Sequence, residues 1–144
     1  MEANPPFTFG SVLIVDDSEI DVLVNRRLME ITRFASHVII ARDGAEALHY
    51  LESECRSAAE APDWIFLDMH LPVLSGIEFI EAFKSLPSSI RTKSKILILS
   101  VLQKPEMLEE ILQYDFVYGR ADKPLTQQAL NQLAAASRVT SFSS

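Results

Sequence analysis

Short apolar runs alternate along the chain with longer segments in which apolar residues recur at helical spacing. Most of the runs are rich in valine, isoleucine and leucine and do not alternate with polar residues, which is typical of strands buried on both faces of a parallel sheet. Five such strands are predicted, over residues 12–15, 38–41, 64–67, 96–99 and 116–121.

Amphipathic helices are predicted between and after these strands. Their apolar residues lie three and four positions apart, so they share one face of a helix. Ser18 and Thr126 stand where N-cap residues are expected, Asp21 adds a carboxylate in the first turn, and Pro87 follows a helix end. The predicted helices cover residues 18–33, 45–56, 76–86, 105–114 and 127–138.

Five strands that alternate with five helices predict an α/β fold, in which a doubly wound, five-stranded parallel sheet carries helices on both faces. Right-handed crossovers restrict the topology to a few strand orders. Because the alternation begins near residue 9 and ends near residue 138, we expect one domain over 9–138. Residues 1–8 are then an N-terminal extension and residues 139–144 a flexible tail.

Composition narrows the class of partner. The 144 residues carry a formal net charge of −7, which disfavours direct binding to nucleic acid. The apolar runs are too short to cross a membrane, and the first residues lack the basic and apolar regions of a secretion signal. Cys55 is the single cysteine, which excludes an internal disulfide and suggests a buried thiol in a reducing compartment. We therefore expect a cytoplasmic protein without a nucleic-acid partner or membrane insertion.

Residues that can carry chemistry follow four of the five predicted strands. Asp16 and Asp17 follow the first strand, and Asp68 follows the third. Ser100 ends the fourth, and Lys123 comes shortly after the fifth. In open parallel sheets, ligands bind beyond the carboxyl ends of the strands. We therefore expect these five side chains to lie together at one edge of the sheet.

Three clustered carboxylates require a positive partner. Two unit charges 4 Å apart repel by about 4 kcal/mol at an effective dielectric constant of 20. Carboxylate oxygens suit Mg²⁺, which often links carboxylates to a phosphate. Lys123 and Ser100 add a charge and a hydrogen-bond donor for phosphoryl oxygens. Asp68 is then the candidate nucleophile, because a carboxylate can form an acyl phosphate.

Four motifs resemble those of the receiver domains of two-component response regulators. They are Val-Asp-Asp-Ser at 15–18, Leu-Asp-Met-His-Leu-Pro at 67–72 with Gly76, Leu-Ser at 99–100 and Lys-Pro at 123–124. Each motif alone is common, whereas all four in order, each at a strand end, form a specific signal. The resemblance spans residues 9–138 and implies the flavodoxin-like strand order 2-1-3-4-5.

The resemblance implies a metal site and a phosphoacceptor. Asp17 would be a direct Mg²⁺ ligand, Asp16 would act largely through water, and Asp68 would be both ligand and phosphoacceptor. The backbone carbonyl of His70 would complete the protein's share of the coordination. Ser100 and Lys123 would each hold a phosphoryl oxygen.

The resemblance also implies partners. The phosphoryl donor would be a phosphohistidine on a sensor histidine kinase or a histidine phosphotransfer protein. The chain would be a stand-alone receiver that catalyses only its own phosphorylation and dephosphorylation, not an enzyme for external substrates. It would signal through phosphorylation-dependent protein contacts, on the face formed by the fourth predicted helix, the fifth strand and the last helix.

The chain departs from the family at the position of an aromatic ring that turns inward on activation, here called the switch position. Many receivers have a tyrosine or phenylalanine three residues before the lysine, where this chain has Arg120. Tyr118 is expected on the same side of the strand but about 6.6 Å away along it, so it could replace the aromatic residue only if the end of the strand is bulged. We expect the coupling between hydroxyl and aromatic ring to be weakened or rerouted, with Arg120 adding a cation to the partner surface. Val101 should narrow access to the acyl phosphate, while His70 and Leu102 should set its lifetime.

Three other functions stay open at this point. A phosphorelay shuttle that passes phosphate to another histidine has the same motifs. A phosphatase with an aspartyl-phosphate intermediate, such as a haloacid dehalogenase, usually has a second acid two residues after the nucleophile, where this chain has His70. A flavodoxin-like nucleotide or flavin binder is disfavoured because the first strand–helix turn, residues 16–19, is acidic and lacks glycine.

Overall fold

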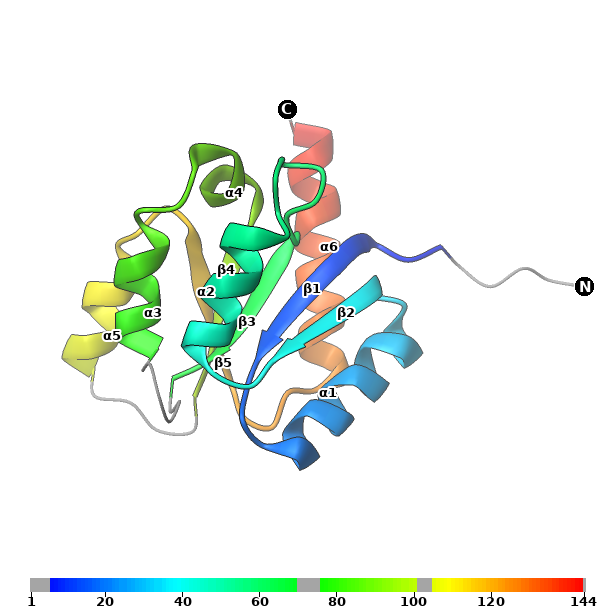
Figure 1. The fold of residues 1–144 in the computed structure, drawn as a ribbon. Helices are drawn as coiled ribbons and strands as arrows, with labels where there is room; N and C mark the ends of the chain where they lie inside the picture. The colour runs from blue at the N-terminus through cyan, green and yellow to red at the C-terminus, as the bar shows by residue number, and fades with distance from the viewer. Residues whose placement is uncertain (1–5, 70–75, 101–104, 144) are drawn as a thin grey trace, which may run out of the picture.

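A parallel sheet forms the centre of the computed structural model, which describes residues 6–69, 76–100 and 105–143 (Figure 1). Its strands stand in the order β2-β1-β3-β4-β5, and every neighbouring pair is parallel. The predicted α/β class and the strand order 2-1-3-4-5 are thereby confirmed. The strands are β1 (Phe9–Val15), β2 (Ala35–Ala41), β3 (Trp64–Asp68), β4 (Lys95–Ser100) and β5 (Val117–Asp122).

The described residues form six helices, one more than predicted. The additional helix, α4, starts directly after Pro87 and is too short for apolar residues to recur on one face, so the periodicity did not reveal it. The last helix continues to Ser143, beyond the predicted end at residue 138. The helices are α1 (Glu19–Thr32), α2 (Gly44–Ser53), α3 (Gly76–Phe83), α4 (Ser88–Lys93), α5 (Pro105–Leu112) and α6 (Gln127–Ser143).

Helices cover both faces of the sheet, as the uninterrupted apolar strands predict. Alternate residues of a strand point to opposite faces. Val12 and Ile14 therefore pack with residues of α1 and α6, whereas Leu13 and Val15 pack with residues of α2, α3 and α5. Figure 1 shows these two groups of helices on either side of the strands.

Side-chain caps start helices immediately after strand ends. The Oγ of Ser18 accepts a hydrogen bond from the backbone N–H of Asp21 at 3.2 Å, and Thr126 caps α6 by accepting from Ala129 at 3.1 Å. Cys55 is buried, as expected. No helix within the described part of the chain has both the length and the apolar character needed to span a membrane.

Candidate functional site

The predicted site residues meet at one edge of the sheet. Asp16 and Asp17 follow β1, Asp68 is the last residue of β3, and one carboxylate oxygen of each lies within 4.8 Å of the others. Ser100 ends β4, and Lys123 directly follows β5. The Nζ of Lys123 lies 3.0 Å from Oδ2 of Asp68 and 3.6 Å from Oδ2 of Asp16, and its backbone N–H donates to the carbonyl of Ser100 at 3.1 Å. The expected cluster is therefore present.

Burial sets the electrostatics of this cluster. The side chain of Asp16 is 0% exposed and that of Asp68 is 5% exposed, whereas Asp17 faces solvent. Burial raises the pKa of Asp16, although the backbone N–H of Ser18 and the charge of Lys123 act in the opposite direction. Burial also opposes the charge of Lys123, but the hydrogen bond to Asp68 and the negative charges of Asp68 and Asp16 prevail and raise the pKa of Lys123. The ammonium is thus held charged beside Asp68.

Two buried oxygens of the cluster have no hydrogen-bond partner among the residues that the structure describes. Oδ1 of Asp16 accepts a hydrogen bond from the backbone N–H of Ser18 at 2.9 Å, but Oδ2 accepts none. The Oγ of Ser100 also lacks a partner. A buried polar atom left unpaired costs about 1–3 kcal/mol. A divalent cation suits this carboxylate oxygen, which lies 3.6 Å from the Nζ of Lys123 but accepts no hydrogen bond, and a phosphoryl oxygen suits the serine hydroxyl. These residues therefore fit Mg²⁺ with a phosphoryl group.

Asp21 is a member of the cluster that the sequence pattern did not assign to it. Its Oδ2 lies 3.3 Å from the Nζ of Lys123. The pattern indicated only a helix-start carboxylate, which is stabilising near a helix N-terminus for its own reasons. The signal that could have placed it is its spacing from Ser18, because the third residue after an N-cap lies in the first turn and close to the strand ends. Asp21 therefore competes with Asp68 for the ammonium.

Gly76 explains why one of the motifs needs glycine. A Cβ at this position would lie 2.6 Å from the Sδ of Met69 and 3.0 Å from its Cα. Met69 directly follows Asp68 and is buried. The start of α3 can therefore pack against the backbone next to Asp68 only without a side chain.

The comparisons with known proteins agree with this site. The chain matches the family model described as "Response regulator receiver domain" over residues 12–135. The chain belongs to this family. Response regulator Rcp1 of Synechocystis sp. is 29% identical to the receiver over 100 residues, which cover 69% of this chain and 66% of Rcp1. The receiver therefore spans less than two thirds of the length of this curated relative.

Solved structures give the same result. A two-component response regulator from Cytophaga hutchinsonii matches with a TM-score of 0.80 and 27% identity, covering 89% of this chain and 96% of that one. A response regulator receiver protein from Dyadobacter fermentans matches with a TM-score of 0.74 and 25% identity, covering 85% and 93%. Receiver domains are signalling proteins that bind Mg²⁺ at an acidic pocket and accept a phosphoryl group from histidine kinases or phosphotransfer proteins.

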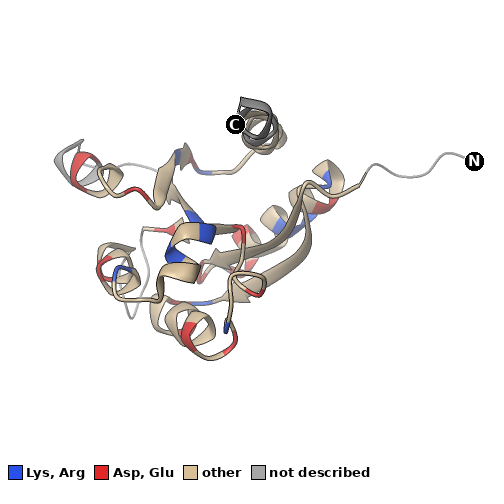
Figure 2. Cartoon of the chain, turned by 90° about the horizontal axis from the view of Figure 1, so that it is seen from above, with Lys and Arg blue, Asp and Glu red and all other residues tan. Residues whose placement is uncertain are grey.

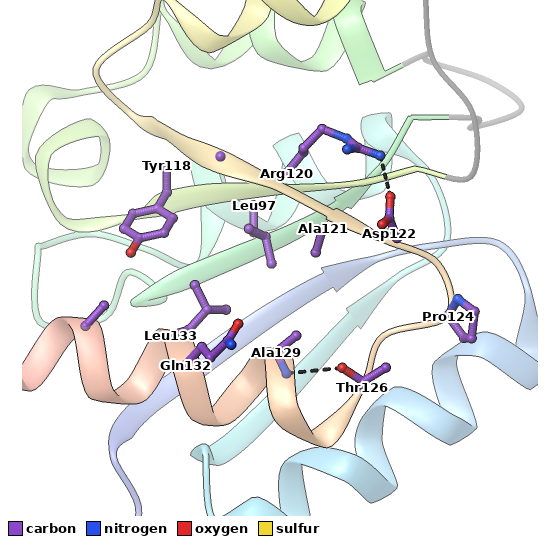
Figure 3. A pocket seen from close by; sticks show the side chains of 12 residues that line it. Leu97, Tyr118, Arg120, Ala121, Asp122, Pro124, Thr126, Ala129, Gln132 and Leu133 are labelled. Atoms are coloured by element: carbon purple, nitrogen blue, oxygen red, sulfur yellow. Dashed lines mark hydrogen bonds and ion pairs between the residues drawn. The ribbon is translucent and has the colours of Figure 1, made fainter.

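The switch position of this receiver differs from the prediction in one respect. A bulge in β5 makes Tyr118 an extra residue, because Ile96 pairs with Val117 whereas Leu97 pairs with Gly119. The expectation that Tyr118 and Arg120 point to the same side of the strand was therefore wrong. Figure 3 shows the two side chains on opposite sides of β5.

Each of these two side chains has a partner other than Ser100. The ring of Tyr118 contacts the edge of Trp64 with centroids 5.0 Å apart, on the side of the sheet where α6 packs. Arg120 forms an ion pair with Asp122 at 2.5 Å. The tyrosine thus cannot substitute for the missing aromatic residue in this conformation. The predicted roles of His70, Val101 and Leu102 fall on positions outside the described residues.

Proposed function

We propose that this receiver accepts a phosphoryl group on Asp68, from a phosphohistidine of a sensor histidine kinase or phosphotransfer protein, and signals through phosphorylation-dependent protein contacts. The observation that carries the proposal is the buried carboxylate of Asp68 in contact with Lys123, beside two further carboxylates. Among the described residues, neither the Oδ2 of Asp16 nor the Oγ of Ser100 has a hydrogen-bond partner, although both are buried. This arrangement has a nucleophile, a fixed cation and sites for a metal and a phosphoryl oxygen in one place.

Asp68, Lys123 and Ser100 have different roles in the proposed phosphoryl transfer. An oxygen of Asp68 attacks phosphorus, an O–P bond forms as the N–P bond breaks, and the electron pair returns to the imidazole nitrogen of the donor. Lys123, already 3.0 Å from Asp68, remains close enough to pair with a phosphoryl oxygen after transfer. The hydroxyl of Ser100 donates to another phosphoryl oxygen. Both interactions neutralise charge that develops during transfer.

Asp16, Asp17 and Asp68 are the proposed protein ligands of Mg²⁺, with the backbone carbonyl of His70 as a fourth ligand outside the described residues. When bound, Mg²⁺ neutralises the carboxylates and orients the phosphoryl oxygens. The buried Oδ2 of Asp16, which accepts no hydrogen bond from a described residue, and the close approach of the three carboxylates support this assignment.

The N-terminal half of α1 is the proposed docking site for the phosphodonor. Ile20, Leu23 and Val24 are 75%, 69% and 43% exposed, although they are large and apolar. Ile20 and Val24 also line a hollow of about 230 Å³ whose wall includes Lys123. An exposed apolar patch of this kind marks an interaction site. Its position beside Lys123 would place a bound partner next to Asp68.

The face formed by α5, β5 and α6 is the proposed output surface, and it corresponds to the fourth predicted helix, the fifth strand and the last helix. Leu112 and Tyr118 are large apolar residues that are 40% and 46% exposed on it. A groove of about 540 Å³ runs between β5 and α6, with Arg120 in its lining (Figure 3). That Arg120 contributes a cation to the partner surface stays a prediction, since its guanidinium forms an ion pair with Asp122.

Incubation with acetyl phosphate tests the proposed chemistry without a partner protein. The wild type should gain the mass of one phosphoryl group in the presence of Mg²⁺ and not in the presence of EDTA. Asp68→Asn should gain none, whereas Asp115→Asn, the same change at an exposed position, should behave like the wild type. Phosphorylation that persists in Asp68→Asn, or that is independent of the metal, would refute the proposal.

A further inference from the structure

The single ammonium of Lys123 is shared among three carboxylates. Its Nζ lies 3.0 Å from Oδ2 of Asp68, 3.6 Å from Oδ2 of Asp16 and 3.3 Å from Oδ2 of Asp21. Asp68 and Asp16 already have a role in the proposed phosphoryl transfer, since both are proposed ligands of Mg²⁺. Asp21 has no such role, although it lies nearer to the ammonium than Asp16 does.

Asp21 is fixed at the start of α1 and lies outside the proposed metal site. The described carboxylates whose oxygens approach within 4.8 Å of one another are those of Asp16, Asp17 and Asp68. The backbone N–H of Asp21 donates to Oγ of Ser18 at 3.2 Å, and this cap fixes the turn from which its carboxylate reaches the ammonium. The side chain of Asp21 is 42% exposed, so water solvates its charge and no metal ion is needed to balance it.

The ammonium of Lys123 is held by charge more than by the shape of its surroundings. A hollow of about 230 Å³ lies beside it, between α1 and residues 123–125, and both Asp21 and Lys123 line this hollow. The backbone of Lys123 is fixed, because its N–H donates to the carbonyl of Ser100 at 3.1 Å. Its side chain is a flexible stem of methylene groups that loses rotamer freedom when it is held in one place. The ammonium therefore has room to leave Asp68 if its electrostatic partners change.

Two of the three attractions weaken when the metal site is filled. Asp16 and Asp68 then share their negative charge between Mg²⁺ and the ammonium, and the two cations repel each other. Asp21 keeps its full attraction for the ammonium, because it is not among the proposed metal ligands. We propose that Asp21 is a positioning residue, which keeps the ammonium of Lys123 beside Asp68 while the metal site is occupied.

This inference rests on the proposed phosphoryl transfer to Asp68 and adds one requirement to it. An ammonium has three N–H donors, so Lys123 can keep one on Asp21 and direct another at a phosphoryl oxygen. Without Asp21 the ammonium would occupy more positions and would neutralise less of the charge that develops during transfer.

Solution NMR of the full chain tests the position of the ammonium without any phosphorylation. The ¹H–¹⁵N signal of a lysine ammonium is observed only when ion pairs slow the exchange of its protons with water, and the signal of Lys123 is identified by its absence from Lys123→Gln. The wild type should show this signal both in EDTA and with saturating Mg²⁺. Asp21→Asn should show it in EDTA, where Asp16 and Asp68 hold the ammonium, and should lose it with Mg²⁺.

The rate of phosphorylation by acetyl phosphate at saturating Mg²⁺ is the second measurement. Asp21→Asn, which conserves the shape of the side chain, should react about threefold more slowly than the wild type, a loss within the range of a partly exposed ion pair. Asp21→Glu retains a carboxylate and should recover most of the rate.

Glu19→Gln is the matched control, because it removes a carboxylate from the same turn of α1. The side chain of Glu19 is 82% exposed and pairs with Arg42 at 3.4 Å, not with Lys123. Acidic and basic residues occur on helices of both faces of the sheet (Figure 2), so the two substitutions change the overall field by the same single charge. Glu19→Gln should retain the NMR signal with Mg²⁺ and the rate of the wild type.

Several outcomes would overturn the inference. A Lys123 signal that persists in Asp21→Asn with Mg²⁺, or that is absent from the wild type with Mg²⁺, would show that Asp21 does not hold the ammonium. Equal slowing in Asp21→Asn and Glu19→Gln would show a general effect of charge or of the helix start. Faster phosphorylation of Asp21→Asn would show that Asp21 withdraws the ammonium from the phosphoryl group. Each of these results leaves the proposed function intact, which fails separately if Asp68→Asn is still phosphorylated.

Discussion

At Gly76, the first residue of α3, an added Cβ would lie 2.6 Å from the Sδ of Met69 and 3.0 Å from its Cα. Replacement of a helical glycine by alanine normally stabilises by up to about 1 kcal/mol. Here the new methyl group meets a buried side chain and a backbone atom, and overpacking of that kind costs about 1–3 kcal/mol. We expect the free energy of unfolding of Gly76→Ala to be about 1 kcal/mol lower than that of the wild type. Helix propensity alone would predict an increase.

Gly119 provides a control for the same substitution. A Cβ there would meet nothing within 4 Å, and its φ is not positive. Gly119→Ala should therefore gain roughly 0.5–1 kcal/mol, as expected for a glycine within a strand. Urea unfolding of the two variants measures both values. Because Met69 follows Asp68, Gly76→Ala should also slow phosphorylation by acetyl phosphate. A Gly76→Ala variant that is at least as stable as the wild type and is phosphorylated at the same rate would refute this reasoning.

Four further predictions concern the metal, the donor and the output surface. Asp16→Asn should stabilise the protein in EDTA at neutral pH, because it removes a buried charge. It should also weaken Mg²⁺ binding in a calorimetric titration. A variant that is no more stable than the wild type in EDTA would contradict this prediction. Since burial raises the pKa of Asp16, protonation of this carboxyl should reduce Mg²⁺ affinity as the pH falls, at a higher pH than an ordinary aspartate would, and an affinity independent of pH in that range would count against the assignment. Leu23→Ser should slow phosphotransfer from a phosphohistidine protein at least several-fold but leave phosphorylation by acetyl phosphate unchanged, whereas equal effects on both would exclude α1 as the docking site. Arg120→Ala should weaken partner binding to the phosphorylated form, and an unchanged affinity with unchanged phosphorylation dependence would remove Arg120 from the output surface.

Much of the fold could be predicted because burial of apolar runs and local capping geometry are determined by the sequence itself. The apolar runs have to be buried on both faces, and this requirement alone gives a parallel sheet covered by helices. Ser18 and Thr126 act as caps because an N-cap depends on local geometry that the sequence determines. The convergence of Asp16, Asp68 and Lys123 follows in turn, since parallel strands end at a common edge.

The features that could not be predicted depend on contacts between distant segments. The bulge beside Tyr118 arises from how β5 pairs with β4 and from the packing of the ring on Trp64, and neither leaves a periodic signal. The ion pair between Asp21 and Lys123 joins residues that are far apart along the chain, so a carboxylate that resembled a helix-start residue belongs to the site.

The identity of the phosphorylated side chain tests the central claim most directly. Borohydride reduction of the acetyl-phosphate-treated protein converts an aspartyl phosphate to homoserine, and peptide mass spectrometry then locates it. We predict homoserine at position 68 alone, only in samples that contained Mg²⁺. Homoserine at Asp16, Asp17 or Asp21, or none in a sample that had gained a phosphoryl group, would contradict the account.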